Sequence, residues 1–258
     1  MGLGAYERPR DLPEALALLA SGSWQVMAGA TDIFPSRAHV AGWGATPVRD
    51  WLDITGIAAL RGVTRTAAGW RIGATTSWAD LRDAALPPGF DALRESARQV
   101  GGRQIQARGT IGGNLCNASP AADGVPPLLV LDAEVELASE HGARRLPLAE
   151  YILGNRRTAR APDEMLVALH VPDGRAQSRS VFLKLGARSH LVISIVMVAA
   201  DASGRVAVGS CSEVARMWDD TPLTPMDDVR GTARYRHAAA AELVARARES
   251  LAFEGRAA

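Results

Sequence analysis

The sequence predicts a mixed α+β fold, and three observations support it. Short apolar strands alternate with amphipathic helices as far as residue 175, consecutive strands follow from residue 180, and one long helix closes the chain. The chain has 258 residues, which is enough for two domains with separate cores. Its composition, 47% hydrophobic and 22% charged residues, is typical of a globular protein. We therefore predict a first domain over 1–175 and a smaller domain over 176–258.

The first part of the chain, about 1–55, is expected to form a small subdomain. Pro13 stands at the start of its first helix, where proline is tolerated because that turn needs no N–H donor. The apolar stretch at 24–28 is short enough for a buried strand and runs directly into a small-residue loop. The expected elements are a helix at 11–20, strands at 24–28 and 48–54, and a helix beginning within 33–40.

The second subdomain, about 56–175, mixes both element types. Ser77 precedes an amphipathic stretch and is expected to cap its helix with the side-chain oxygen. Pro172 and Gly174 end the last strand of this block. The expected elements are strands at 60–63 and 70–74 around a turn at 67–69, helices from 78 and at 91–100, and strands at 134–137 and 165–171.

Residues 176–258 are expected to form a sheet with helices. Val181–Leu185 predicts a strand, and the apolar, β-branched stretch at 191–200 predicts a second, longer one. A further strand is expected at 205–209, after a Ser-Gly turn, and a helix at 238–251. The last domain is thus predicted as a short sheet with a closing helix.

Composition and charge exclude several classes of function. The net charge of +1 provides no electrostatic footprint for nucleic acid or an anionic membrane. No apolar run reaches the roughly 18 residues that a membrane span needs. The N-terminus lacks the apolar core of a signal peptide, so the cytoplasm is the expected location. Cys116 and Cys211 lie far apart, which gives neither a zinc nor an iron–sulfur spacing nor a disulfide framework.

The most informative segment is Thr110–Asp123, which reads TIGGNLCNASPAAD. Its adjacent glycines allow positive φ and let a ligand approach the main chain closely. Successive free N–H groups in such a loop would form a nest for a phosphate. Thr110 and Ser119 add short donors, and Asp123 can accept from a sugar hydroxyl. We therefore interpret the segment as a binding loop for a phosphorylated, hydroxyl-rich cofactor.

A second small-residue loop, Ala28–Asp32, follows the predicted strand at 24–28. A glycine after a strand is more often structural than functional when it stands alone. Two such loops in one chain fit a pyrophosphate, which needs donors from more than one side. No Gly-x-Gly-x-x-Gly and no Walker pattern occurs, so this is neither a Rossmann nor a P-loop site.

Together these segments resemble the FAD-binding medium subunits of molybdenum hydroxylases, the flavin subunits of the xanthine dehydrogenase and aerobic carbon monoxide dehydrogenase types. The resemblance covers nearly the whole chain. It is carried by AGATD at 28–32, TIGGN at 110–114, ASPAAD at 118–123, LLVLDA at 128–133, FLK at 182–184 with Arg188, and DDVRGTA at 227–233 with Tyr235 and Arg236.

The resemblance implies a fold and a set of FAD-binding residues. The implied fold is that of vanillyl-alcohol-oxidase-type flavoproteins, with two subdomains enclosing FAD before the C-terminal domain. It places Leu166 near the flavin ring. It also places Lys184, the only lysine of the chain, beside the isoalloxazine, where a fixed cation raises the reduction potential. The expected FAD-binding residues are Ala28, Gly29, Ala30, Thr31, Asp32, Thr110, Ile111, Gly112, Gly113, Asn114, Ser119, Asp123, Leu166 and Lys184.

The resemblance also implies partners. A large subunit would carry the molybdenum cofactor and a small subunit two 2Fe-2S clusters, and the complex would be a dimer of heterotrimers. The lack of cluster-ligating cysteines in this chain agrees with that division. Electrons would pass through FAD to an external acceptor. No catalytic residue and no metal ligand is expected here. Two alternatives stay open: a self-contained FAD oxidase or reductase, and an assembly or scaffold module without flavin.

Two residues and one stretch of the chain depart from the family pattern. Ala30 stands where a second glycine is common, and alanine tolerates positive φ poorly. Cys116 lies inside the second segment, where we expect a small buried residue. The chain is short between Cys211 and Asp228, where the family usually carries a helical segment, so the C-terminal domain is expected to be reduced.

Overall fold

The first sheet is small and parallel. We analysed a computed structural model, which describes residues 4–33, 49–218 and 222–254. Strands β1 (Tyr6–Glu7), β3 (Asp50–Asp53) and β2 (Trp24–Met27) pair in that order. Helix α1 (Leu12–Ser21) is capped by the Asp11 side chain, which accepts from the Glu14 N–H. The expected helix and both strands are confirmed, whereas most of the helix expected at 33–40 lies outside the described residues.

The second sheet has five antiparallel strands. Their order is β4 (Val63–Thr66), β5 (Gly69–Gly73), β10 (Met165–Pro172), β6 (Glu134–Ser139) and β7 (Gly142–Pro147). The strand expected at 60–63 is wrong, because two short 3₁₀ turns, η1 (Ile54–Gly56) and η2 (Ala58–Leu60), precede β4 and the second of them ends only at Leu60. The Leu60 carbonyl turns inward and accepts from the N–H and the hydroxyl of Thr75. The strand therefore begins only at Val63.

Helices cover one face of this sheet. Ser77 caps α3 as expected, in a capping box completed by the Asp80 carboxylate. The helices and turns are α3 (Trp78–Asp83), η3 (Pro88–Phe90), α4 (Asp91–Gln99), α5 (Arg103–Arg108), α6 (Ile111–Asn117), α7 (Val125–Val130), α8 (Leu148–Tyr151) and α9 (Asp173–Ala176), with a hairpin of β8 (Ile152–Gly154) and β9 (Arg157–Thr158).

The third sheet is antiparallel and follows the order β11 (Ser180–Leu185), β12 (Val196–Asp201), β13 (Val206–Gly209) and β14 (Arg216–Met217). The strand expected at 191–200 is shorter, because Leu191 has a φ of +52° and the chain turns before it enters β12. Helix α10 (Ala233–Glu254) begins earlier than expected. Its first turn is capped by Asp227 and Thr232, which accept backbone N–H groups.

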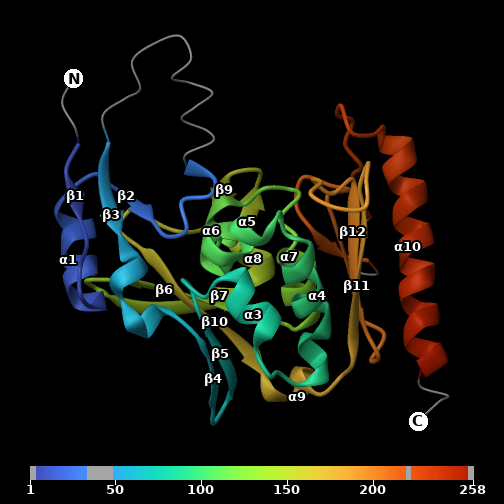
Figure 1. Cartoon of the computed structure of the whole chain (residues 1–258), viewed down its shortest axis with the longest axis horizontal. Helices are drawn as coiled ribbons and strands as arrows, with labels where there is room; N and C mark the ends of the chain where they lie inside the picture. Colours follow the sequence, from blue (N-terminus) through green and yellow to red (C-terminus); the bar gives the residue numbers. More distant parts are fainter. Residues whose placement is uncertain (1–3, 34–48, 219–221, 255–258) are drawn as a thin grey trace.

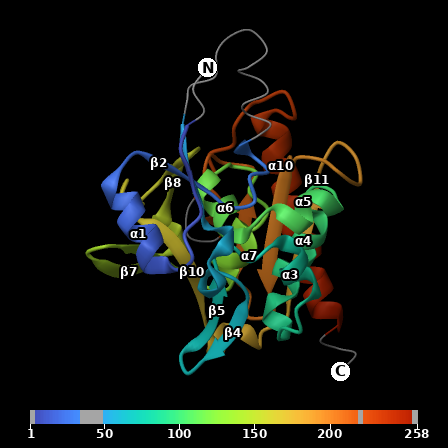
Figure 2. The same cartoon turned by 60° about the vertical axis from the view of Figure 1, so that its left-hand side comes forward.

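The layers follow from the two-residue period of the strands. In β12, Met197 and Ala199 face the helices that cover the second sheet, while Val196 and Val198 face α10. The third sheet thus lies between α4 and α7 on one side and α10 on the other (Figure 1). The first sheet and α1 pack on the opposite face of the second sheet through a cluster that includes Met165 and Val167. Both views place α1 and α10 on opposite sides of the molecule (Figure 1, Figure 2).

Each sheet draws its strands from one continuous part of the chain: β1 to β3 before residue 55, β4 to β10 between 63 and 172, and β11 to β14 from residue 180 onward. The boundaries near 55 and 175 themselves stay a prediction. Within the described part of the chain, no helix is long and apolar enough to cross a membrane.

An ion pair at the edge of the second sheet predicts a pH dependence. Arg144 of β7 donates to both carboxylate oxygens of Glu164, at 2.5 and 2.8 Å. These bonds hold the pKa of the Glu164 carboxyl below its ordinary value of 4.5. A depressed folded-state pKa adds stability above the unfolded-state value, and the contribution is lost as the pH falls through the folded-state value.

We therefore expect Glu164→Gln to lower the free energy of unfolding at pH 7, with a difference from wild type that shrinks below about pH 4.5. Urea titrations at several pH values measure this difference. Glu140→Gln is the matched control, because Glu140 is exposed and forms no ion pair with a described residue. A difference for Glu164→Gln that stays constant down to pH 3 would contradict the assignment.

Candidate functional site

The loop that follows β2 contains unused backbone donors. Among the described residues, no partner is found for the N–H groups of Gly29, Ala30, Thr31 and Asp32. Ala30 has a φ of +58°, in the left-handed region that alanine rarely adopts. Alternation of a left-handed residue with ordinary neighbours turns successive N–H groups toward one side of the chain, which makes an anion-binding nest. Ala30 therefore keeps the conformation that glycine has in this type of loop.

This loop lies against the second segment. A Cβ on Gly29 would stand 1.9 Å from the carbonyl oxygen of Arg108, so only glycine permits the approach. Arg156 adds a link, because its guanidinium donates to Asn117 at 2.7 Å and lies 3.8 Å from the Asp32 carboxylate. The two segments that the sequence singled out are therefore side by side, as a two-sided phosphate site requires.

The second segment is a helix over most of its first half, not a loop. Thr110 is the N-cap of α6, and its side-chain oxygen accepts the N–H of Gly113 at 3.1 Å. Neither Gly112 nor Gly113 has a positive φ, so the expected role of these glycines in a left-handed turn is wrong. The left-handed residue is Ala118, at the C-cap, with a φ of +46°. A short helix formed here because Thr110 supplies the cap.

The N–H groups expected to be free in this segment are also occupied. Those of Ile111 and Gly112 donate to the carbonyls of Thr76 and Ala74, and that of Asn114 donates to the Thr110 carbonyl. Ile111 is fully buried in the core. The unused donors thus lie at 29–32, and the helix forms the wall opposite them.

Glycine occupies positions 112 and 113 for different structural reasons. A Cβ on Gly112 would lie 2.6 Å from the backbone oxygen of Ala74, so this glycine lets α6 pack directly on the end of β5. Gly113 is exposed, and a Cβ there would meet only the Thr110 side chain. Gly112 is thus needed for packing, while Gly113 leaves room on the solvent side.

Two polar side chains of α6, Cys116 and Asn114, have unusual surroundings. Cys116 is exposed, so the expectation of a buried residue is wrong; its Sγ lies 3.3 Å from the Tyr151 hydroxyl. Surrounding protein atoms nevertheless desolvate this thiol and raise its pKa. Asn114 Oδ1 is buried and has no partner among the described residues. An orphaned buried acceptor of this kind is a feature of a ligand site.

Asp123 and Lys184 form a buried ion pair. The distance from Lys184 Nζ to Asp123 Oδ2 is 2.7 Å, and the two side chains are 5% and 9% exposed. Asp123 Oδ1 accepts the Ser194 hydroxyl at 2.6 Å. Burial raises the pKa of the Asp123 carboxyl, and Lys184 and Ser194 oppose that rise. A sugar hydroxyl would have to share an oxygen that already accepts a hydrogen bond, so that role of Asp123 stays a prediction.

Two further expected residues occupy different surroundings. Leu166 is buried in β10, directly before an irregularity in the pairing with β6. Ser119 is half-buried, and its Oγ accepts the N–H of Ala121. Both stay predicted rather than tested contacts.

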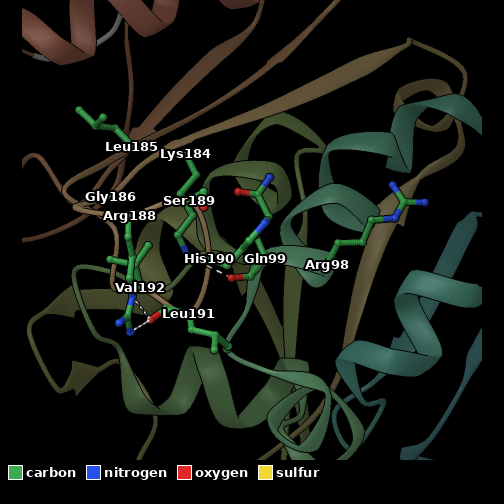
Figure 3. Close-up of a pocket in the computed structure, with 11 residues that line it drawn as sticks. Arg98, Gln99, Lys184, Leu185, Gly186, Arg188, Ser189, His190, Leu191 and Val192 are labelled. Carbon is green, nitrogen blue, oxygen red and sulfur yellow. Dashed lines mark hydrogen bonds between the residues drawn. The ribbon is translucent and has the colours of Figure 1, made fainter.

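A cavity of about 400 Å³ borders Lys184. Arg98, Gln99, Arg188, His190 and Leu191 also line it (Figure 3). Lys184 Nζ donates to the Gln99 carbonyl at 3.2 Å, which ties the end of α4 to β11 at the cavity wall. None of the lining residues is a carboxylate. The cavity therefore favours an anionic or electron-rich ligand group.

Sequence reasoning missed Arg156, Gln99 and Ser194. Arg156 and Ser194 contact the expected site only through residues far away in the chain, and Gln99 contributes a backbone carbonyl. No local pattern marks any of them. Among the described residues, no group of three or more His, Cys, Asp or Glu side chains is placed to hold a metal ion.

Comparison with known proteins decides the family. The model of the FAD binding domain in molybdopterin dehydrogenase matches residues 2–174. This chain belongs to that family. The xanthine dehydrogenase FAD-binding subunit of Escherichia coli O157:H7 is 31% identical over 226 residues, which cover 86% of this chain and 75% of the relative.

Two further comparisons extend the likeness of this molybdopterin dehydrogenase FAD subunit over its full length. The carbon monoxide dehydrogenase medium chain of Afipia carboxidovorans is 27% identical in an alignment 277 residues long, which covers 95% of each chain. A solved structure of reconstituted CO dehydrogenase from Oligotropha carboxidovorans superposes with a TM-score of 0.85 at 25% identity, over 96% of this chain and 97% of that one. The α+β fold expected for an FAD-binding protein is thereby confirmed.

The FAD subunit is accordingly an oxidoreductase subunit of the molybdenum hydroxylase family, and its cofactor is FAD. The residues present fit that cofactor. The nest at 29–32 suits a diphosphate, and the orphaned Asn114 oxygen can accept from a hydroxyl or an amino group.

Proposed function

We propose that this FAD subunit passes electrons from iron–sulfur clusters in a partner subunit, through FAD, to an external acceptor. The observation that carries the proposal is the nest at 29–32, whose N–H donors have no partner among the residues that the structure describes and which faces the wall formed by α6. FAD supplies the redox chemistry when bound. The protein residues bind it, orient it and set the charge around it.

The loop at 29–32 would bind the diphosphate through backbone N–H groups. The Arg156 guanidinium lies next to that loop and adds positive charge near a doubly charged ligand. Lys184 would act differently. Its ammonium is held by Asp123 and Gln99 at the edge of a cavity, so it presents a charge of fixed position to a ligand there.

The partners follow from the relatives. The similar chains are named as the FAD-binding subunit or medium chain of a dehydrogenase. We infer a large subunit with the molybdenum cofactor and a small subunit with two 2Fe-2S clusters, assembled as a dimer of heterotrimers. In this arrangement the substrate is hydroxylated in the large subunit, and this chain carries only the last electron transfer.

Purification of the native protein tests the proposal. We expect a complex of three kinds of chain that contains molybdenum, iron and about one FAD per copy of this chain. A single chain that turns over a small substrate by itself would support the alternative of a self-contained flavin oxidase or reductase. A colourless preparation without flavin absorbance would support the scaffold alternative and overturn the proposal.

A pair of glycine variants tests the site. Gly113→Ala overlaps no backbone atom, because its Cβ meets only the Thr110 hydroxyl, which would have to shift slightly, and it fills the space on the solvent side of α6. We expect FAD to bind about tenfold more weakly, equivalent to about 1.4 kcal/mol. Gly112→Ala is the contrasting variant, because its Cβ would overlap backbone atoms of Ala74; it should lower the melting temperature. Flavin fluorescence titration and thermal unfolding measure the two effects, and equal FAD affinity of Gly113→Ala and wild type would refute this placement.

Lys184→Ala should lower the midpoint potential of the bound flavin and slow electron entry. A lone charge about 4 Å from the ring would be worth about 4 kcal/mol at an effective dielectric of about 20. We expect a smaller shift, because the Asp123 carboxylate opposes the ammonium. Spectroelectrochemical titration of the purified protein provides the measurement. An unchanged potential would show that Lys184 does not act on the flavin.

A further inference from the structure

Helix α10 sends one completely buried guanidinium into the third sheet. Arg236 is 0% exposed, and its Nη1 donates to the carbonyls of Ile195 and Ser210, at 2.5 and 2.6 Å. Its Nη2 donates to Asp228 at 2.5 Å. A buried arginine with all these bonds has one position only. It therefore holds two separate backbone segments, at 195 and at 210, at a fixed spacing.

Ser210 connects this arginine to the cofactor segment. It is buried and has a φ of +61°, a conformation that a serine keeps only when its surroundings impose it. Its N–H donates to the Pro120 carbonyl at 3.0 Å, and its hydroxyl donates to the Ser194 carbonyl at 2.7 Å. Ser210 thus fixes the backbone of Ser194 relative to the segment at 119–123.

Ser194 completes the connection. Its side chain is fully buried, and its hydroxyl donates to Asp123 Oδ1 at 2.6 Å. The other oxygen of Asp123 accepts from Lys184 at 2.7 Å. A carboxylate held at both oxygens cannot rotate about its terminal bond without losing a charge-assisted hydrogen bond. The position of the Lys184 ammonium therefore depends on a hydroxyl that does not touch it.

We propose that Ser194, held in place by Ser210 and Arg236, is a positioning residue that fixes the Asp123 carboxylate and thereby the Lys184 ammonium at the wall of the cavity. The inference rests on the proposed function for its effect on FAD. Its structural part stands on the contacts alone. Hydrogen bonds thus link Arg236 of the last helix, through Ser210, Ser194 and Asp123, to the Lys184 ammonium.

The chain offers an unusually clean test, because Lys184 is its only lysine. Acetic anhydride, used at limiting concentration on the full chain without FAD, can acetylate Lys184 and the N-terminal amine, which serves as an internal reference. Mass spectrometry of the two peptides yields the ratio of their rates. In wild type, Lys184 should react slowly, because its ammonium is buried and paired.

Ser194→Ala should raise the relative acetylation rate of Lys184 about tenfold, since a hydrogen bond to a charged group is worth at least that factor. Ser189→Ala is the matched control: Ser189 lies in the same loop between β11 and β12 and lines the same cavity, but it is exposed and its hydroxyl bonds to none of the described residues. Ser194→Cys retains a weak donor, should give an intermediate rate, and replaces the alanine variant if that variant does not fold. The inference would be overturned if the Ser194 variants were acetylated at rates within about twofold of wild type, because loss of one hydrogen bond should change the rate by more than that.

The midpoint potential of the FAD-loaded protein separates the two proposals. We expect Ser194→Ala to shift it in the same direction as Lys184→Ala and by less. If Lys184→Ala leaves the potential unchanged while Ser194→Ala still speeds acetylation, the proposed action of Lys184 on the flavin fails and the positioning stands. If Lys184→Ala shifts the potential and Ser194→Ala changes neither measurement, the positioning role alone fails.

Discussion

The buried ion pair between Lys184 and Asp123 joins the parts of this molecule that must act together. Asp123 ends the segment that begins with α6, and Lys184 lies in β11 of the third sheet. Removal of one partner from a pair so deeply buried costs roughly 3–5 kcal/mol, because the other charge is left without compensation. Such a pair is tolerated only where its geometry is fully determined, and here Ser194 and the Gln99 carbonyl complete it.

This constraint explains why the third sheet lies where it does. One face of β12 packs on α4 and α7, and the other face packs on α10. The apolar faces could slide along the strands at modest cost, since hydrophobic burial has no direction. The ion pair and the bonds of Ser210 and Arg236 have direction, and they set the register between the third sheet and the cofactor segment.

The two glycine segments differ in their available N–H donors, and the difference is the reverse of what their composition indicates. The segment at 110–123 has the more conspicuous sequence, but Thr110 caps a helix there and every N–H from Ile111 to Asn114 is used within the protein. The loop at 28–32 looks like an ordinary turn, yet its N–H groups at 29–32 have no partner in the described part of the chain. Composition cannot distinguish these cases, because a glycine can permit a close helix contact, as Gly112 does, or lie at an open surface, as Gly113 does.

Local elements and motifs could therefore be predicted from the sequence, whereas contacts between side chains from distant segments could not. The sequence by itself determined most of the strands, the Ser77 cap and the family, since each depends on neighbouring residues or on a motif within one segment. Only the tertiary structure decided that Lys184 is paired with Asp123, that Cys116 is exposed, that Ser194 bonds to Asp123 and that Arg236 is buried in the third sheet. The physical reason is that burial and hydrogen-bond partners arise from segments up to a hundred residues apart, about which local spacing contains no information.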